Sequence, residues 1–316
     1  MSLTIHAYKD SDDYWKIRDF LRQVMLLNNR RENSWPVARW DYWYWFANPD
    51  LEKRTLEESI FIWEDSDGQI AAVLNPEGHG QAFLQLSPLH RTTGLVEEML
   101  STAEEHLARA GENGLCSLEV YIDSKDELLK AVLGQHGYQQ VTRAGEQEIQ
   151  HRRTLAQPLT PRMDVSGYTL RPMGDGLELL ERCYASGLGF HDDDIQVARK
   201  NRDNPVWYHH IQSAPLYRRD LDLVAVAPDG SIASFCTVWF DDVTRTSYFE
   251  PVATVAAHRR RGLGKALLIE GLHRIKEMGC LVAFVGGYSE RANALYFSVM
   301  GEEYDVSEPW EKQFVP

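Results

Sequence analysis

An internal repeat constrains the fold of this chain more than any other feature of its sequence. Asp67-Gly68 and Asp229-Gly230 each lie between two strand-like apolar runs, a setting in which Asp-Gly is typical of a β-hairpin turn. The motif His-Arg-x-x-Gly-Leu occurs at residues 90–95 and again at residues 258–263. The offset between the copies is 230 − 68 = 162 residues at the hairpins and 258 − 90 = 168 residues at the His-Arg motifs. Two ordered copies of the same landmarks predict two domains with the same fold.

Each copy is predicted to contain the same elements in the same order. A short strand is followed by two helical patterns, three strands, a helix after the His-Arg turn, a buried strand, a helix and a terminal hairpin. Strands on both sides of a helix imply a right-handed crossover. We therefore expect an α/β protein in which each domain is a mixed, mostly antiparallel sheet flanked by helices. The segment 152–164, with Pro158 and Pro161, is the predicted linker, and the predicted domains are residues 1–155 and 165–316.

The charge balance narrows the classes of function. Lys and Arg number 33 against 47 Asp and Glu, so the formal net charge is −14. A general nucleic-acid binder needs a broad basic face, and no apolar run reaches the ~18 residues of a membrane span. The start of the chain lacks a signal-peptide pattern, and four widely spaced cysteines form no disulfide framework. We expect a cytoplasmic protein that binds neither nucleic acid nor membranes, and we expect no metal, because no ligand spacing such as HExxH occurs.

A basic, glycine-containing turn is the strongest candidate for chemistry. It reads Arg259-Arg260-Arg261-Gly262-Leu263-Gly264-Lys265 and lies between a predicted strand and a predicted helix. The first turn of a helix has amides without intrahelical partners and a positive dipole end, so it binds phosphate readily. Glycine lets a diphosphate approach the backbone. A basic helix start with glycines for tight packing is the alternative. The turn is neither a Rossmann fingerprint nor a Walker loop.

Arg259-x-x-Gly262-x-Gly264 resembles the Arg/Gln-x-x-Gly-x-Gly/Ala signature of the GCN5-related N-acetyltransferases (GNATs). The downstream segment 292–296, Ala-Asn-Ala-Leu-Tyr, is similar to the second motif of that superfamily. The resemblance covers residues 165–316 well and residues 1–155 in pattern only. It implies a tandem GNAT protein.

The resemblance also implies an activity and its residues. An acetyl group would move from acetyl-CoA to a primary amine of a small molecule or peptide, by direct attack in a ternary complex. Tyr296 would be the general acid for the leaving thiolate, and Glu250 is the candidate general base. In the alternative, the Glu250 carboxylate pairs with a nearby arginine and a water chain serves as the base. Asn293 would bind the cofactor or cap a helix. The expected cofactor-binding residues are Val252, Thr254, Arg259, Arg260, Arg261, Gly262, Leu263, Gly264, Lys265 and Asn293.

Several positions depart from the family pattern. Five residues rather than four separate Tyr296 from Gly301, so Phe297 could take the aligned place. In the first half, Val96 replaces the second glycine and Leu133 stands where the tyrosine is expected. The first half is therefore predicted to be a degenerate, non-catalytic copy. A non-catalytic CoA-binding or partner-binding module that keeps the fold is the rival interpretation of the whole chain.

Three further features have both a structural and a functional interpretation. The aromatic segment 35–46 would be core or inter-domain packing rather than the wall of a substrate or acyl pocket. The run His191-Asp192-Asp193-Asp194 would either cap a helix or attract a cationic amine. Cys236 and Cys280 would be small core residues rather than nucleophiles.

Overall fold

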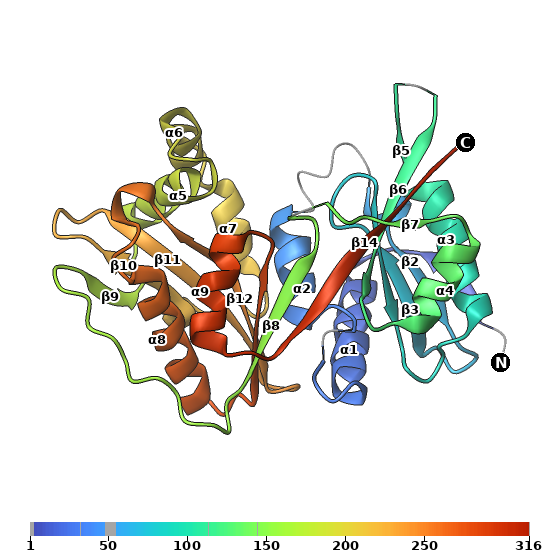
Figure 1. Cartoon of the computed structure of the whole chain (residues 1–316), viewed down its shortest axis with the longest axis horizontal. Coiled ribbons are helices and arrows are strands. Elements are labelled where there is room, and N and C mark those ends of the chain that lie inside the picture. The colour runs from blue at the N-terminus through green and yellow to red at the C-terminus, as the bar shows by residue number, and fades with distance from the viewer. Residues whose placement is uncertain (1–2, 32, 48–54, 113, 144, 316) are drawn as a thin grey trace. The chain divides into compact units, whose positions relative to one another are not determined.

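The computed structural model describes residues 3–31, 33–47, 55–112, 114–143 and 145–315. The chain divides into two compact units, residues 1–150 with 305–316 (unit 1) and residues 151–304 (unit 2). Figure 1 shows both, coloured along the chain. Within the described part of the chain, no helix has the length and apolar character needed to cross a membrane.

The units differ from the predicted domains 1–155 and 165–316 because the two halves exchange their last strands. Strand β14 (Tyr304–Phe314) ends the chain but pairs antiparallel with β6 (Cys116–Asp123), from Ser307 opposite Asp123 to Phe314 opposite Cys116. Strand β8 (Glu148–Thr154) ends the first half but lies beside β13 (Val282–Gly287). The predicted terminal hairpin within each half is therefore wrong. Periodicity identifies a strand but does not reveal its partner.

Unit 1 has the strand order β1-β2-β3-β4-β6-β14, with the two-residue strands β5 and β7 attached to β6 and β14. Among the strand pairs that the structure describes in this unit, β4 and β6 run parallel, and the other pairs run antiparallel. Its other elements are β1 (Thr4–Ala7), α1 (Ser11–Leu27), α2 (Val37–Tyr42), a π-helical turn (Trp43–Ala47), a 3₁₀ turn (Leu56–Glu58), β2 (Phe61–Glu64), β3 (Ile70–Asn75), β4 (Gln81–Leu86), α3 (Thr93–His106), β5 (Arg109–Ala110), α4 (Glu127–Gln135) and β7 (Gln139–Gln140).

The aromatic segment 35–46 belongs to the core of unit 1. Trp35, Trp40 and Trp43 are buried and pack with α1 and with strand residues such as Phe83. Trp40 stacks on Trp43, with ring centroids 5.3 Å apart. The prediction of core packing is confirmed, since large aromatic surface is removed from water here.

Unit 2 has the strand order β8-β13-β12-β11-β10-β9. Strands β9 to β12 pair antiparallel, whereas β12 and β13 pair in parallel. The predicted hairpin at Asp229-Gly230 is confirmed by the pairing of β10 with β11, and that at Asp67-Gly68 by β2 with β3. The remaining elements are β9 (Thr169–Pro172), α5 (Leu177–Phe190), α6 (Ile195–Asp203), α7 (Val206–Ser213), a 3₁₀ turn (Arg219–Leu221), β10 (Asp222–Val226), β11 (Ile232–Asp241), β12 (Thr246–Thr254), a second 3₁₀ turn (Ala256–His258), α8 (Leu263–Glu277) and α9 (Glu290–Met300).

Helices cover both faces of this second sheet, which is why every residue of β11 is buried. A Cβ on Gly271 of α8 would lie 2.7 Å from Phe249, and a Cβ on Gly189 of α5 would lie 2.9 Å from Ala253. Glycine thus lets each helix approach β12 closely, from opposite faces. Figure 1 shows α8 and α9 running across the strands of this unit.

Candidate functional site

The candidate site of unit 2 begins where β12 and β13 separate. The two strands pair only at residues 246–248 and 282–284, although both continue further. Beyond this point β12 stays paired with β11, but Cys236 faces Val252 while Val238 faces Phe249, so β12 has one extra residue. An extra residue bends a strand, and Pro251 within it has no N–H to offer. The carboxyl ends of β12 and β13 therefore diverge.

The divergence opens a cleft of about 990 Å³, which is at the upper end of the usual size of small-molecule sites. Its walls come from the ends of β12 and β13, the start of α8, the first turns of α9 and the end of α5. The lining residues are Gly189, Phe190, Val252, Ala253, Thr254, Ala256, His258, Arg259, Arg260, Gly262, Leu263, Gly264, Lys265, Gly286, Gly287, Tyr288, Ser289, Arg291, Ala292, Ala294, Leu295 and Tyr296.

The start of α8 presents backbone amides to this cleft. Its N-cap, Gly262, has a φ of 80° and no side chain that could accept a hydrogen bond. The amides of residues 260–265 make no hydrogen bond with any residue that the structure describes. A Cβ on Gly264 would lie 3.2 Å from Leu295 and 3.5 Å from Thr254, so the second glycine also allows tight packing. The packing interpretation of the glycines therefore holds, and their role in binding a diphosphate stays a prediction.

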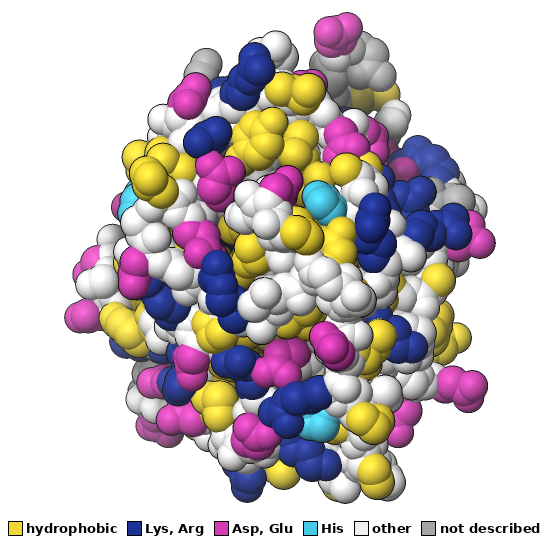
Figure 2. Space-filling view, turned by 90° about the vertical axis from the view of Figure 1, so that its left-hand side faces the viewer, with side chains coloured by type: hydrophobic (Ala, Val, Ile, Leu, Met, Phe, Trp, Pro, Cys, Tyr) yellow, Lys and Arg dark blue, Asp and Glu magenta, His cyan; other side chains and the backbone are white. Residues whose placement is uncertain are grey.

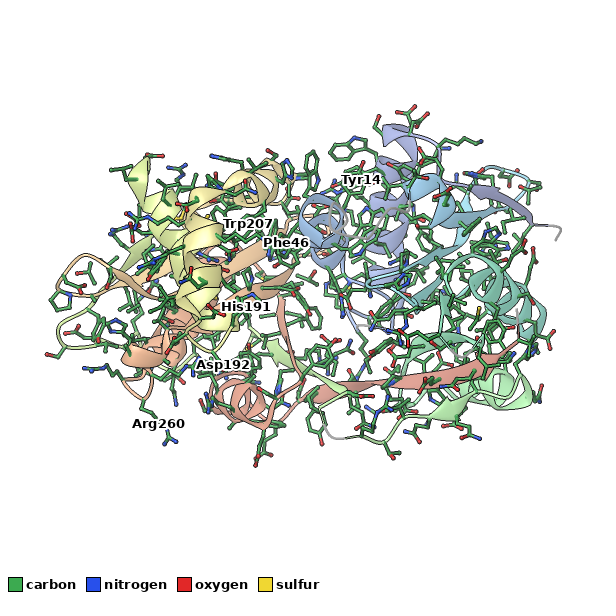
Figure 3. All side chains as sticks on the ribbon, turned by 90° about the horizontal axis from the view of Figure 1, so that it is seen from above. Tyr14, Phe46, His191, Asp192, Trp207 and Arg260 are labelled. Atoms are coloured by element: carbon green, nitrogen blue, oxygen red, sulfur yellow. The ribbon has the colours of Figure 1, made fainter. Side chains whose placement is uncertain are left out.

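Basic side chains surround these amides. Arg259, Arg260, Lys265 and the unpredicted Arg291 line the cleft. The Arg259 Nε donates to the carbonyl of Thr254 over 3.1 Å, which ties the turn to the end of β12. Arg261 is exposed and does not line the cleft. Figure 3 shows Arg260 pointing outward at the margin of the unit.

Tyr296 reaches the cleft from α9. Its side chain is 7% exposed, and its hydroxyl makes no hydrogen bond within the described structure. Burial, then Cys236 and Glu250, raise the pKa of Tyr296 well above its usual value near 10. The phenol therefore stays protonated at neutral pH, as a proton donor requires.

Glu250 lies in the extra-residue region of β12 and is half-buried. Its backbone carbonyl accepts a hydrogen bond from Trp239 Nε1 over 2.6 Å. Its carboxylate is close enough to Tyr296 to raise the pKa of that residue, but Glu250 is not among the residues lining the cleft. The predicted acid and base are thus near one another, and only the acid borders the cleft.

Residues 187–301 match the family described as the Acetyltransferase (GNAT) family. The matched residues lie within unit 2, which is called the GNAT domain below. This match supports an acyl-transfer function in general terms.

The whole chain has the fold of tandem GNAT proteins. It resembles a tandem GNAT protein from the clavulanic acid biosynthesis pathway, solved without AcCoA, with a TM-score of 0.67, 14% identity and coverage of 100% of this chain and 99% of that one. A GCN5-related N-acetyltransferase from Sphaerobacter thermophilus gives a TM-score of 0.61 at 20% identity. The match covers 99% of this chain and 96% of that one. An acetyltransferase from the GNAT family of Colwellia psychrerythraea gives a TM-score of 0.57 at 9% identity. The match covers 98% of this chain and 99% of that one. No curated protein sequence matches this chain significantly.

The structure places two residues of the second motif of the GNAT domain outside the lining of the cleft. Asn293 does not line the cleft; its Oδ1 lies 2.9 Å from His151 Nε2. It does not cap α9 either, because Ser289 is the N-cap and accepts from the amide of Ala292. Phe297 points away from the cleft, and its ring packs edge-on against His151. The helix therefore presents Tyr296, and not Phe297, to the cleft.

The cysteines of the GNAT domain are core residues, as predicted. Cys236 and Cys280 belong to the apolar cluster between the sheet and α8. Burial raises the pKa of Cys236, and it raises the pKa of Cys280 to about 11. Both stay protonated at neutral pH, and a protonated thiol is a poor nucleophile.

The acidic run 191–194 combines capping with a contact to the cleft wall. Asp194 is the N-cap of α6 and accepts from the amides of Gln196 and Val197. The Oδ1 of Asp193 accepts from the amide of Ala256, which lines the cleft. The capping interpretation thus holds for Asp194. Figure 3 labels His191 and Asp192 in this run.

The described residues contain no group of three or more His, Cys, Asp or Glu arranged to hold a metal ion. Figure 2 shows one face of the molecule, on which basic and acidic side chains are interspersed over most of the surface.

Among the cleft residues, Arg291, Tyr288 and Phe190 were not predicted from the sequence. Helical spacing could have indicated Arg291, since it precedes Leu295 by four residues on α9.

Proposed function

We propose that the GNAT domain transfers an acetyl group from acetyl-CoA to a primary amine of a small molecule or peptide. The observation that carries this proposal is the unpaired start of α8 at the mouth of the 990 Å³ cleft. Free amides, a helix dipole and nearby Arg and Lys side chains suit a diphosphate. The residues present therefore fit the cofactor.

The edge of β12 suits the amide-containing arm of the cofactor. Residues 252–254 pair with β11 on one side, and past Tyr248 the strand has no pairing with β13 on the other. Backbone groups left free on a strand edge are ready to pair with an extended ligand. An acyl thioester lying there would point toward Tyr296, deeper between the strands.

The chemistry needs three proton transfers. The substrate ammonium loses a proton, its nitrogen forms a bond to the thioester carbonyl carbon, and the carbon–sulfur bond breaks. The sulfur takes one proton as it leaves, and the new amide nitrogen loses another. In sum, an ammonium and acetyl-CoA give an acetamide, CoA thiol and one released proton.

Tyr296 is the proposed donor to the sulfur, and Glu250 is the proposed acceptor of the amine proton, through water because it does not border the cleft. The raised pKa of Tyr296 makes full proton transfer to a thiolate uphill. Its hydroxyl would therefore act first by hydrogen bonding to the sulfur while negative charge develops there.

Titration calorimetry with acetyl-CoA, followed by a thiol-release assay, tests the proposal. We expect one acetyl-CoA site per chain and amine-dependent release of CoA with at least one of spermidine, kanamycin or a peptide with a free N-terminus. Binding without release above the hydrolysis blank would favour the CoA-binding module instead. Absence of binding would refute the cofactor assignment.

A further inference from the structure

A histidine from the end of the first half of the sequence is buried against the helix that bears Tyr296. His151 lies on β8 and is fully buried within unit 2. Its Nε2 lies 2.9 Å from Asn293 Oδ1. Its Nδ1 is buried and has no hydrogen-bond partner in the described structure. The histidine is not among the residues lining the cleft, so any effect on the reaction has to pass through a neighbour.

The protonation state of this histidine follows from its surroundings. Burial lowers the pKa of His151, and the hydrogen bond to Asn293 acts in the opposite direction. The imidazole is therefore neutral at pH 7. Because Asn293 presents its oxygen, the ring hydrogen is on Nε2 and is donated to it. The interaction is a directional neutral hydrogen bond rather than an ion pair.

Asn293 and Tyr296 are three residues apart on α9, so they share one face of the helix. That face packs on the end of β13 at Gly287. A Cβ there would lie 2.3 Å from Asn293 Oδ1 and 3.1 Å from Tyr296 Cδ2. The absence of a side chain at Gly287 lets both residues sit directly on the strand.

The imidazole also touches the aromatic rings of α9. Its centroid lies 5.5 Å from that of Tyr296 at 71° and 4.4 Å from that of Phe297 at 79°, both edge-to-face. Edge-to-face contacts restrict ring orientation. The Tyr296 hydroxyl has no hydrogen bond in the described structure that could orient it. The direction of the phenol therefore depends on how its ring and helix are packed.

From this geometry we propose that His151 is a positioning residue for Tyr296. By donating to Asn293 and packing edge-on against the tyrosyl ring, it holds α9 in the rotation that points the phenol into the cleft. The inference rests on the proposed function, because it assigns a partner to the proposed acid. It also gives β8, the strand that the first half contributes to unit 2, a role in the reaction.

The test compares two substitutions of His151. His151→Leu removes the hydrogen bond and keeps an apolar side chain of moderate size, whereas His151→Gln can still offer an N–H to Asn293. We expect His151→Leu to lower kcat about 10- to 100-fold, as a misplacement of about 1 Å does, with the KM for acetyl-CoA nearly unchanged. His151→Gln should restore most of the loss. His273→Leu is the matched control, because that partly exposed histidine on α8 bonds the Thr160 carbonyl and does not line the cleft.

A double variant separates positioning from general damage. In a Tyr296→Phe background, His151→Leu should cause little further loss of kcat, because its effect passes through the missing hydroxyl. Independent, additive losses would overturn the inference. So would an unchanged kcat in His151→Leu when Tyr296→Phe is impaired.

A readout that needs no turnover keeps the inference separate from the proposed function. In protein labelled with ¹³C-tyrosine, the Tyr296 signal is identified by its loss in Tyr296→Phe. We expect it to shift or broaden in His151→Leu and to keep its position in His151→Gln. An unchanged signal in His151→Leu would refute the inference even if acetyl transfer is found. If no amine is acetylated, the proposed function fails and this signal still decides the positioning role. Asn293→Ala should reproduce the spectrum of His151→Leu, and it serves if His151→Leu does not fold.

Discussion

The turn before α3 and the turn before α8 have related sequences, yet a side chain caps only the first. In unit 1, the N-cap of α3 is Thr92, whose Oγ1 accepts from the amide of Leu95. In unit 2, the N-cap of α8 is Gly262, which has no side chain to do so. Arg91 forms an ion pair with Asp126. A side chain thus caps one amide of the first turn, whereas no side chain caps the amides of the second.

The strands behind the two turns show the same contrast. In unit 1, β4 and β6 pair in parallel at residues 81–83 and 119–121. Past this point, the ends of the strands border a cavity of only about 30 Å³, whose walls include Trp35, Phe83 and Tyr121. That volume suits a water molecule rather than a cofactor. Phe83 and Tyr121 stack at 5.0 Å and 9°, and aromatic side chains occupy the region that is open in unit 2.

The second motif also differs between the two units, because only unit 2 has a tyrosine there. Asp126 and Ser289 are the N-caps of α4 and α9, and seven residues later stand Leu133 and Tyr296. Leu133 is fully buried and has no hydroxyl. The comparison teaches that a duplicated fold keeps its backbone plan while side chains close one copy. We expect the first half to have a structural role and the second to carry the activity.

The largest effect is expected from a charge placed at the open turn. Gly264→Glu adds a carboxylate where the diphosphate is proposed to lie, and like-charge juxtaposition costs several kcal/mol, which is more than about 100-fold in affinity. Calorimetry with acetyl-CoA measures this. Gly94→Glu is the control in the closed copy, where a Cβ meets nothing within 4 Å, and it should bind like the parent. Equal affinity in all three proteins would break the comparison between the turns.

The next effect concerns the tyrosine that only the second copy has. Tyr296→Phe removes the proposed acid and should lower kcat about 100-fold, with acetyl-CoA affinity nearly unchanged. Steady-state kinetics and calorimetry measure the two quantities separately. Tyr138→Phe in unit 1 is the control, since its hydroxyl bonds Glu104 in the copy that is not proposed to be catalytic. An unchanged kcat in Tyr296→Phe would remove the acid role.

The pH dependence sharpens the same assignment. A folded-state pKa above 10 keeps the Tyr296 phenol protonated as the pH rises through the value of a free tyrosine. Wild-type kcat should therefore show no loss from ionisation of the acid between pH 8 and about 10. A pH profile of kcat tests this. A decline centred below pH 10 that is absent in Tyr296→Phe would contradict the direction of the shift.

The smallest effect is a loss of stability in the closed copy. Thr92→Ala removes the side-chain cap of α3 and should cost about 1 kcal/mol, a shift of about 2–4 °C in the melting temperature. Thermal unfolding followed by circular dichroism measures it, and acetyl-CoA binding should not change. A gain of a second binding site in calorimetry would show that the cap alone closes unit 1.

Local sequence signals predicted much of the fold and part of the site. The hairpins at residues 67–68 and 229–230, the helix after Gly262 and the open turn depend on spacing and residue type within a few positions. For that reason they could be predicted without tertiary information. Tyr296 was also predicted correctly as the aromatic residue that faces the cleft, although the distance to Gly301 left Phe297 as an alternative.

Other features depend on residues that are distant in the sequence. The contact of Asn293 with His151, 142 positions away, could not be predicted from the local pattern around either residue. The exchange of β8 and β14 between the two halves could not be predicted either, because an alternating strand pattern is compatible with either sheet.

The sequence by itself determined the duplication, the order of elements and the chemistry of the Arg259–Lys265 turn, because each is a property of neighbouring residues. Only the tertiary structure decided which strand completes which sheet, how far β12 and β13 separate, and that one copy is filled by aromatic side chains while the other holds a cleft. The physical reason is that packing and strand pairing bring together residues far apart in the chain, and their net contacts are not encoded in any local pattern.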